Sequence, residues 1–420
     1  MQTSLEGIAK KAQREKKYRF QNLYGMIDTD LLTYSWTHLN KNAASGVDGI
    51  SYREYGENVS ENIEKLVGRL KEKKYRAKLV RRQYIPKGNG KMRPLGIPAI
   101  EDKLVQYAAM LLLQGVYEQD FLPCMYGYRA ARGAKDAVVD LRNTLQDGKY
   151  NYVVEADIKG FFDNISHSWL IKMLEQRVDD KAFIRLITKW LKAGVLDTDN
   201  KVIHPVTGTP QGGIISPVLA NIYMHYAICL WFEKVYKKQC KGKAYICMYA
   251  DDFVCAFEEK KDAEKFYAEL KRRLEKFGLE LSIEKTNIIY FGKRSNNTFD
   301  FLGFEFRMSR LRRRFIRIRT SRKKMQGSLN NFKIWCKENR NLPMWILINE
   351  LNTKLKGYYN YYGIKGNSKS LSIFFRQIVR TLFKWVNRRS QRKSYNWSGF
   401  IEAIKAYGIL KPRLVYGFSE

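Results

Sequence analysis

Three aspartates stand beside strongly apolar residues in a chain otherwise rich in lysine and arginine. Asp157 follows the run NYVVEA, and Asp251 and Asp252 separate two apolar runs within residues 244–259. Carboxylates clustered at strand ends repel one another, and their desolvation is costly unless cations compensate. Mg²⁺ accepts a few carboxylates together with phosphate oxygens, and two ions about 4 Å apart can activate a hydroxyl and stabilise a leaving pyrophosphate. The simpler alternative, a solvated aspartate pair at a turn, is disfavoured by the apolar flanks.

Two further segments carry residue types suited to phosphate chemistry. Residues 80–98, VRRQYIPKGNGKMRPLGIP, predict a β-hairpin whose arms hold Lys87, Lys91 and Arg93. These side chains are either phosphate ligands or ordinary surface cations. Residues 202–232 contain no formally charged side chain and include GTPQGG at 208–213, a backbone turn without side-chain bulk.

Alternating strands and helices must position these residues, which predicts an α+β fold. Residues 151–157 have the β-branched core of a buried strand, and residues 244–259 predict a second hairpin with its acids at the tip. Helices are expected at about 101–119, 180–192, 217–238 and 262–278. The uncharged residues 214–232 are long enough to be considered as a membrane span, but Pro217, Asn221 and His225 favour a buried helix.

Composition points to a partner that is a long polyanion. The 420 residues carry 76 Lys+Arg against 42 Asp+Glu, a formal net charge of +34, and nucleic acid is the first candidate. An anionic membrane surface is the rival, but the basic residues are spread along most of the chain. The N-terminus lacks the apolar core of a signal peptide, and the six cysteines lack zinc-ligand spacing. We therefore expect a cytoplasmic protein with buried thiols and without a structural zinc.

Four regions are expected along the chain. Residues 1–75 are helical and highly charged and are predicted to be a surface appendage, and residues 76–306 contain the strands and helices described above. Residues 307–324 hold ten basic residues and no acid, which predicts a basic linker at a domain boundary. Residues 325–420 are expected to be a helical, aromatic-rich domain.

The order of motifs resembles that of group II intron reverse transcriptases, the intron-encoded maturase family. SGVDGIS resembles the N-terminal extension motif, IPKGNGKMRPLGIP the fingers hairpin, and YGYRAARGAKDAV the second block of that family. EADIKGFFDNISH, GTPQGGIISPVLANIYM, YADD, GLELSIEKTNIIYF and FDFLGFEF resemble later blocks, and LKGYYNYYGI and WVNRRSQRKSYNW resemble the thumb or maturase domain. The resemblance implies a right-hand polymerase, with fingers and an antiparallel palm sheet packed on helices, followed by a helical thumb.

The resemblance also assigns roles to individual residues. It implies metal binding by Asp157, Asp251 and Asp252 and by the backbone carbonyl of Ile158. For the incoming dNTP it implies contacts from Lys87 and Arg93 to the triphosphate, from Phe162 beneath the sugar, from Gln211, and from Lys285 near the pyrophosphate. A core position is open for the neighbouring Phe161, since two adjacent residues of an extended segment face opposite ways. A plain surface position is open for Lys285.

Nucleic-acid contacts are expected from the basic segment and the helical domain. The candidate residues are Arg312, Arg313, Arg314, Arg317, Arg319, Tyr358, Tyr359, Arg388 and Arg389. For the tyrosines near Gly357, which include Tyr361 and Tyr362, packing in a helical core is favoured over stacking on RNA.

The resemblance implies an RNA-directed DNA polymerase that uses two Mg²⁺ ions, with Mn²⁺ as the alternative ion. Its partners would be an RNA template with a DNA or RNA primer, dNTPs and a structured group II intron RNA that it helps to splice, without a membrane. The oligomeric state stays open. A domesticated reverse transcriptase in phage defence, or a splicing factor without polymerase activity, are the alternatives. YGYRAARGA departs from the more usual GFRPGR of the family, and nothing after residue 397 resembles the HNH endonuclease extension of some members.

Overall fold

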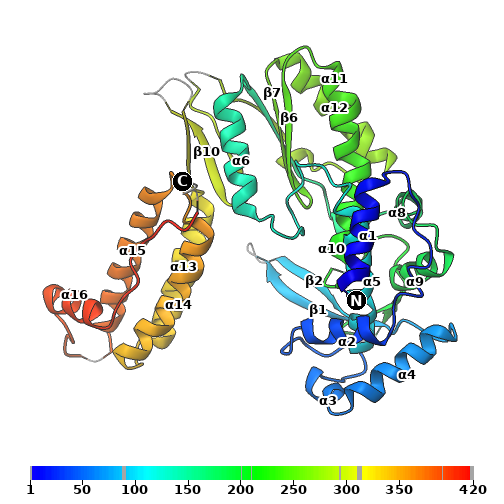
Figure 1. The fold of residues 1–420 in the computed structure, drawn as a ribbon. Coiled ribbons are helices and arrows are strands. Elements are labelled where there is room, and N and C mark those ends of the chain that lie inside the picture. Colours follow the sequence, from blue (N-terminus) through cyan, green and yellow to red (C-terminus); the bar gives the residue numbers. More distant parts are fainter. Residues whose placement is uncertain are drawn as a thin grey trace.

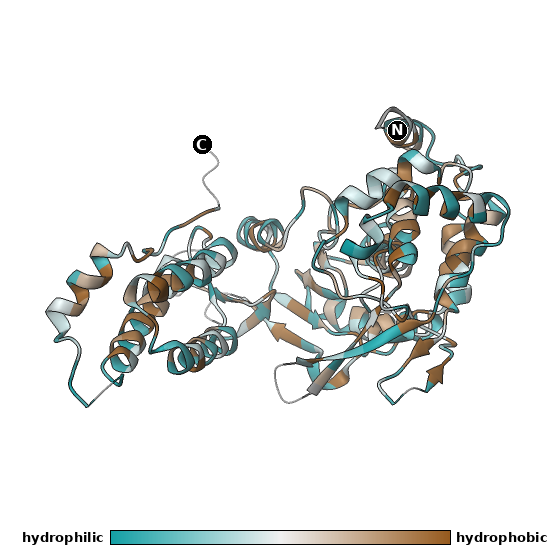
Figure 2. Cartoon of the chain, turned by 90° about the horizontal axis from the view of Figure 1, so that it is seen from below, coloured by the Kyte–Doolittle hydropathy of each residue, from teal (hydrophilic) through white to brown (hydrophobic). Residues whose placement is uncertain are grey.

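A computed structural model describes residues 2–87, 91–199, 201–209, 211–292, 295–309, 315–389 and 391–416, except for the side chains of residues 2, 3, 87 and 91. The C-terminal helices lie at one end of an elongated molecule, and the remaining helices and sheets form the other end (Figures 1 and 2). The α+β fold expected from the sequence is confirmed.

Four helices precede the first strand: α1 (Gln2–Arg14), α2 (Thr29–His38), α3 (Tyr52–Gly56) and α4 (Val59–Lys71). They are not the surface appendage that their charge suggested. Ile8 and Ala12 of α1 are buried in the main core against α5 (Ile100–Tyr117), where a Cβ added at Gly115 would lie 3.2 Å from the Ile8 side chain. A narrow apolar stripe among lysines was sufficient to bury this helix.

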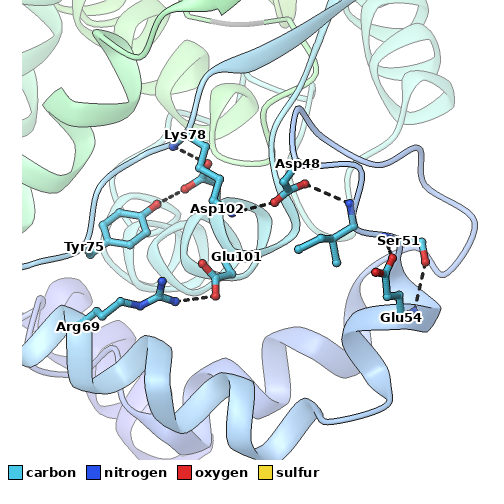
Figure 3. A network of polar contacts seen from close by, with 9 residues as sticks. Asp48, Ser51, Glu54, Arg69, Tyr75, Lys78, Glu101 and Asp102 are labelled. Atoms are coloured by element: carbon cyan, nitrogen blue, oxygen red, sulfur yellow. Dashed lines mark hydrogen bonds and ion pairs between the residues drawn. The ribbon is translucent and has the colours of Figure 1, made fainter.

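Polar contacts fasten the same N-terminal region to the start of α5 (Figure 3). Lys78 forms an ion pair with Asp48 at 2.9 Å, and Arg69 forms one with Glu101 at 2.5 Å. The buried Asp102 accepts hydrogen bonds from the hydroxyl of Tyr75 and from the backbone N–H of Lys78. Burial raises the pKa of Asp102 to about 6, and these bonds oppose the shift. The loop that carries the SGVDGIS motif is therefore attached to the body of the protein.

The predicted hairpin at residues 80–98 is confirmed. Strands β1 (Val80–Lys87) and β2 (Lys91–Ile97) pair antiparallel, and they join β4 (Val195–Leu196) and β5 (Val202–Ile203) in the order β2-β1-β4-β5. We call this the fingers sheet.

A second four-stranded sheet, which we call the palm sheet, has the order β6-β7-β3-β8 and is antiparallel throughout. Its strands are β3 (Tyr152–Ala156), β6 (Ala244–Tyr249), β7 (Asp252–Phe257) and β8 (Asn287–Tyr290). Both the predicted buried strand and the predicted second hairpin are confirmed. Helices of the same region are α6 (Ala134–Asp147), α7 (Phe161–Asn164), α8 (His167–Leu174), α9 (Lys181–Leu191) and α12 (Lys260–Lys276).

The uncharged stretch forms a buried helix, as expected. It begins with α10 (Ser216–Met224), continues through π-helical turns at His225–Cys229 and Phe232–Tyr236, and ends with α11 (Lys237–Gln239). Among the described residues, no helix combines the length and apolar character needed to cross a bilayer. All six cysteines are free thiols.

The basic segment 307–324 is not a linker where the structure describes it. Its residues complete β10 (Phe304–Met308), form β11 (Ile316–Thr320) and begin α13 (Arg322–Asn339). β10 pairs on one side with β11 and on the other with β9 (Thr298–Phe301), which gives a three-stranded sheet. Apolar Ile316 and Ile318 alternate with the arginines and are buried, so the arginines occupy only one face of β11. Arg312, Arg313 and Arg314 lie outside the described residues.

The last region is helical, as predicted, with α13, α14 (Met344–Tyr362), α15 (Ser368–Val386) and α16 (Trp397–Ala406). After α16 the chain returns toward the palm, and we call residues 413–416 the C-terminal strap. Val415 donates its N–H to the carbonyl of Gly363 at 2.6 Å, and the hydroxyl of Tyr416 bonds to Asp136 at the start of α6. The strap therefore ties the helical domain to the palm.

We expect Asn367→Ala to destabilise the protein by about 3 kcal/mol, because it removes the partners of several buried polar groups. The fully buried Asn367 accepts from the N–H of Thr320 and donates to the Thr320 hydroxyl and to the carbonyl of Tyr362, each at 2.9 Å. Urea unfolding followed by circular dichroism measures the effect. Asn330→Ala, at an exposed position of α13, is the control and should shift the midpoint little; equal shifts would contradict the prediction.

Candidate active site

The palm sheet brings the three predicted aspartates to one end. The antiparallel register of β3 and β7 pairs Ala156 with Phe253, and one further step sets Asp157 opposite Asp252. Asp251 lies in the two-residue turn between β6 and β7, next to Ala250, whose φ is 58°. The sequence placed these residues on separate strands; the pairing of β3 with β7 makes them neighbours.

The pleat of the sheet decides which way the carboxylates point. Ala156 and Phe253 are buried in the main core, on the side of the long buried helix. Side chains alternate along a strand, so Asp157 and Asp252 project from the opposite face. That face is toward the three-stranded sheet and the C-terminal helices. Glu155 lies on the same face and accepts the backbone N–H of Asp300 at 2.7 Å.

The charges at this end of the sheet are poorly compensated by the protein. The pKa of Asp252 is raised to about 7, first by desolvation and then by the negative charges of Asp251, Asp157 and Glu155, while Lys324 opposes the shift. Asp252 remains open to solvent on one side, so its desolvation by the surrounding protein is incomplete. A site that holds several ionisable acids at such cost is suited to a cation.

Lys285 supplies one cation to this cluster. Its Nζ lies 2.8 Å from Oδ2 of Asp157, and both side chains are substantially exposed. The structure therefore places Lys285 at the candidate site rather than at an unrelated surface position. Because the pair is exposed, the ammonium is free to move away when another cation approaches.

The donor set fits Mg²⁺ in its chemistry, since it offers carboxylate oxygens that repel one another. Among the described residues, however, no three or more His, Cys, Asp or Glu side chains form a closed metal-binding group. Ile158 is compatible with its expected role: the bridge to Leu281 uses the carbonyl of Asp157 and the N–H of Lys159, not the carbonyl of Ile158. Two to three protein ligands with substrate phosphates completing the shell is the usual arrangement for Mg²⁺.

The predicted dNTP ligands Arg93 and Gln211 are in direct contact. Arg93 Nε donates to Gln211 Oε1 at 2.9 Å, and Gln211 Nε2 lies 3.3 Å from Oδ2 of Asp163 in α7. The N–H of Gly96 donates to the Gln211 carbonyl at 2.6 Å. We call Arg93, Gln211 and Asp163 the relay, because it connects the fingers sheet to the palm. Asp163 was not among the predicted site residues, because its role depends on this tertiary contact. The side chain of Lys87 lies outside the described residues.

Glycines allow the GTPQGG turn to lie close to neighbouring backbone. The neighbour is the fingers sheet at Gly212 and helix α7 at Gly208. Gly212 has φ 112°, and a Cβ there would lie 2.7 Å from the carbonyl oxygen of Gly96. Gly208, with φ 89°, is similarly close to the carbonyl of Asp163. Side chains at either position would push the turn away from its neighbours.

The expectation for Phe161 and Phe162 was wrong in its geometry. The two residues begin the short helix α7 instead of continuing an extended segment, because Gly160 with φ 50° turns the chain. Both rings are buried in the same core, with centroids 5.4 Å apart. The backbone carbonyl of Phe162 accepts the N–H of Thr209 at 2.8 Å, which places Phe162 behind the GTPQGG turn.

A cavity of about 730 Å³ opens between Asp252 and the C-terminal helices. Leu302 and Gly303 line it from the three-stranded sheet, and Lys324 and Tyr361 line it from the helical domain. The Tyr361 hydroxyl donates to the carbonyl of Leu302 at 3.0 Å. The cavity is continuous with the carboxylate cluster and is bordered by cations.

The predicted nucleic-acid contacts divide into exposed and structural residues. Tyr359 is fully buried, so the prediction that it contacts nucleic acid was wrong; Tyr358 stacks on Phe374 at 3.7 Å, as packing in a helical core predicts. Arg319 pairs with Glu305, and Arg389 donates to the carbonyl of Leu342. Arg317 and Arg388 are exposed.

We expect Asp252→Asn to stabilise the metal-free protein at pH 8. A carboxyl whose pKa is raised on folding contributes stability at low pH that is lost as the pH rises through its folded pKa, here about 7. The neutral amide avoids this loss, and a gain of about 2 °C in melting temperature is expected after discounting for solvent exposure.

The measurement is thermal unfolding in a chelator at pH 8 and at pH 5, with Asp199→Asn as the control for a remote exposed aspartate. The gain should shrink at pH 5, where Asp252 is largely protonated. Adding Mg²⁺ at pH 8 should stabilise the unmodified protein more than the variant. A gain independent of pH would contradict the electrostatic explanation.

Comparisons with known proteins agree with the order of these elements. The family described as "Reverse transcriptase (RNA-dependent DNA polymerase)" matches residues 85–306, and the family described as "Group II intron, maturase-specific domain" matches residues 309–399. The first match ends and the second begins at the start of the basic segment.

Individual relatives cover the chain to different extents. The group II intron-encoded protein LtrA of Lactococcus lactis subsp. cremoris is 39% identical over 224 residues, which are 53% of this chain and 37% of that protein. Protein YkfC of Escherichia coli (strain K12) is 32% identical over 317 residues, covering 68% of this chain and 81% of that protein. A solved structure of telomerase from Candida albicans aligns with 85% of this chain and 66% of that chain, at 13% identity and a TM-score of 0.46.

Proposed function

Because the chain belongs to the reverse transcriptase (RNA-dependent DNA polymerase) family and carries a group II intron maturase-specific domain, we propose that it copies RNA into cDNA. The observation that carries this proposal is the meeting of Asp157 with the Asp251–Asp252 turn at one end of the palm sheet. Lys285 pairs with Asp157 in this cluster, and the relay joins the fingers to the palm, so that together they would hold a nucleoside triphosphate.

Asp157, Asp251 and Asp252 would hold two Mg²⁺ ions, or Mn²⁺ as the alternative, with the carbonyl of Ile158 as a further ligand. When bound, these ions lower the pKa of the primer 3′-hydroxyl and neutralise charge on the transferred phosphate. Lys285, released from Asp157, is placed to approach the negative charge of the pyrophosphate.

The incoming dNTP would be bound by the fingers and the GTPQGG turn. Lys87 supplies a point charge and Arg93 a forked donor for the triphosphate. Gln211, held by Arg93 and Asp163, presents a fixed amide to the sugar. Phe162 lies behind the turn and would exclude a 2′-hydroxyl, so that dNTPs are preferred to NTPs.

A second function, assistance of intron RNA splicing, is supported by the match to the maturase-specific domain at residues 309–399. The net charge of +34 favours binding of a structured RNA through its phosphates, and exposed Arg317 and Arg388 are available for such contacts. RNA binding would require no side-chain chemistry, so it would survive loss of the aspartates.

The test is extension of a DNA or RNA primer on an RNA template with dNTPs and Mg²⁺. cDNA synthesis by the purified chain would support the polymerase. Acceleration of splicing of a group II intron RNA at limiting Mg²⁺ would support the maturase. If the chain made cDNA but bound intron RNA no better than unrelated RNA, the alternative of a domesticated polymerase would be favoured.

A further inference from the structure

The loop that leads into α6 presents an aromatic residue in a strained backbone conformation. Tyr128 has φ 57°, in the left-handed region that bulky residues rarely occupy, and its side chain is 44% exposed. The residue is only partly covered, so its burial does not by itself account for the strained backbone. Strain of this kind persists where surrounding contacts fix the backbone, and it gathers at functional sites.

The residue before Tyr128 is fixed to the catalytic turn. A Cβ added at Gly127 would lie 2.4 Å from the backbone nitrogen of Ala250, so the loop and the turn are in direct backbone contact. Asn221 Nδ2 holds the carbonyl of Gly127 at 2.7 Å. The N–H of Tyr126 donates to the carbonyl of Met248 in β6 at 2.9 Å.

The residue after Tyr128 is fixed to the body of the protein. The side chain of Arg129 is only 5% exposed and pairs with Glu118 at 2.7 Å. Its guanidinium also donates to the carbonyls of Leu122 and Met125 at 3.0 Å and 2.9 Å. With both neighbours held, the backbone at Tyr128 is fixed by the contacts of the loop.

Tyr128 starts beside the turn that carries Asp251, because the adjacent Gly127 touches Ala250. Burial by the surrounding protein raises the pKa of the Tyr128 phenol, the charge of Asp251 raises it further, and the charge of Arg93 lowers it. These charges agree with a side chain that lies near Asp251 on the palm and Arg93 on the fingers. In the proposed function these two groups hold the incoming nucleotide.

We propose that Tyr128 contacts the incoming nucleotide, with its ring packed against the sugar and base and its hydroxyl as a hydrogen-bonding group, and that it thereby sets the KM for dNTP. This inference rests on the proposed polymerase function and adds a substrate-contacting residue to it.

The experiment separates this role from a structural one. Asparagine accepts the left-handed conformation better than tyrosine does, so Tyr128→Asn should melt at the same or a higher temperature than the unmodified chain. If Tyr128 contacts the nucleotide, the KM for dNTP in RNA-templated primer extension should rise about 10-fold or more, with a smaller change in kcat. Tyr128→Phe should raise KM about 3- to 10-fold, which corresponds to one hydrogen bond.

Ala131→Asn is the matched control. Ala131 lies in the same loop, is exposed and has the same φ of 57°, so its replacement relieves similar strain three residues further along the loop. This variant should keep the KM of the unmodified chain. An unchanged KM for dNTP in Tyr128→Asn would overturn the inference. A lower melting temperature, together with a rise in KM and a fall in kcat of equal size, would also overturn it. If the unmodified chain made no cDNA, the proposed function would fail first, and this inference with it.

Discussion

Replacement of both Asp251 and Asp252 by alanine is expected to slow cDNA synthesis at least ~1,000-fold, equivalent to about 4 kcal/mol of transition-state stabilisation. The reason lies in the carboxylates at the end of the palm sheet. The two residues supply two of the four carboxylates at the end of the palm sheet, and Asp157, which Lys285 already pairs, cannot hold two divalent ions alone. The measurement is the rate of extension of a DNA primer on an RNA template with dNTPs and Mg²⁺.

The matched control removes two aspartates from a different hairpin. Asp197→Ala with Asp199→Ala takes the same charge from the connection between β4 and β5, and this variant should retain most of the activity. RNA affinity should be unchanged in both proteins. If the unmodified chain bound RNA tightly but made no cDNA with Mg²⁺ or Mn²⁺, the reading as a splicing factor without polymerase activity would lead.

Substitutions that break the relay are expected to raise the KM for dNTP more than they lower kcat. Arg93→Ala removes a charged donor, and Gln211→Ala removes the group it orients, so each should raise the KM for dNTP by about 10- to 100-fold. Asp163→Ala should have a smaller effect, because its contacts to Gln211 are long, 3.3 and 3.4 Å. The measurement is steady-state KM and kcat in the same assay.

Two comparisons sharpen this test. The effects of Arg93→Ala and Gln211→Ala should not add in the double variant, since the two residues act through one contact. Arg53→Ala is the control, because Arg53 lies at an exposed position of α3, outside the relay. Additive effects, or an equal effect from Arg53→Ala, would show that Arg93 acts only as one charge among many.

The sequence pointed to Asp157, Asp251 and Asp252 as candidate metal ligands because the apolar runs beside them are typical of buried strands. The same reasoning failed for Phe161 and Phe162, since a single glycine turned the expected strand into a helix. It also failed for two basic segments of the chain. The apolar positions of α1 and β11 were hidden among lysines and arginines, so segments that pack in the core were taken for an appendage and a linker.

Tyr128 and Asp163 were missed for a different reason. Nothing in their local sequence distinguishes them; they matter because a loop touches the catalytic turn and because Gln211 reaches α7. Such contacts join residues far apart in the chain, and periodicity carries no information about them. For the tyrosines near Gly357, packing was favoured over stacking on RNA because aromatic side chains are usually buried. Tyr359 is buried, so its inclusion among the nucleic-acid contacts was wrong.

The C-terminal strap has a consequence for the order in which the protein can fold. The bond between Tyr416 and Asp136 closes a separation of 280 residues, so it joins a palm helix to residues that are synthesised much later. Domains commonly fold as units during synthesis, from the N-terminus onward, and long-range contacts form slowly. The palm strands would therefore be complete before the strap is made, and the strap would add its tie between Gly363 and Asp136 to a palm that has already folded.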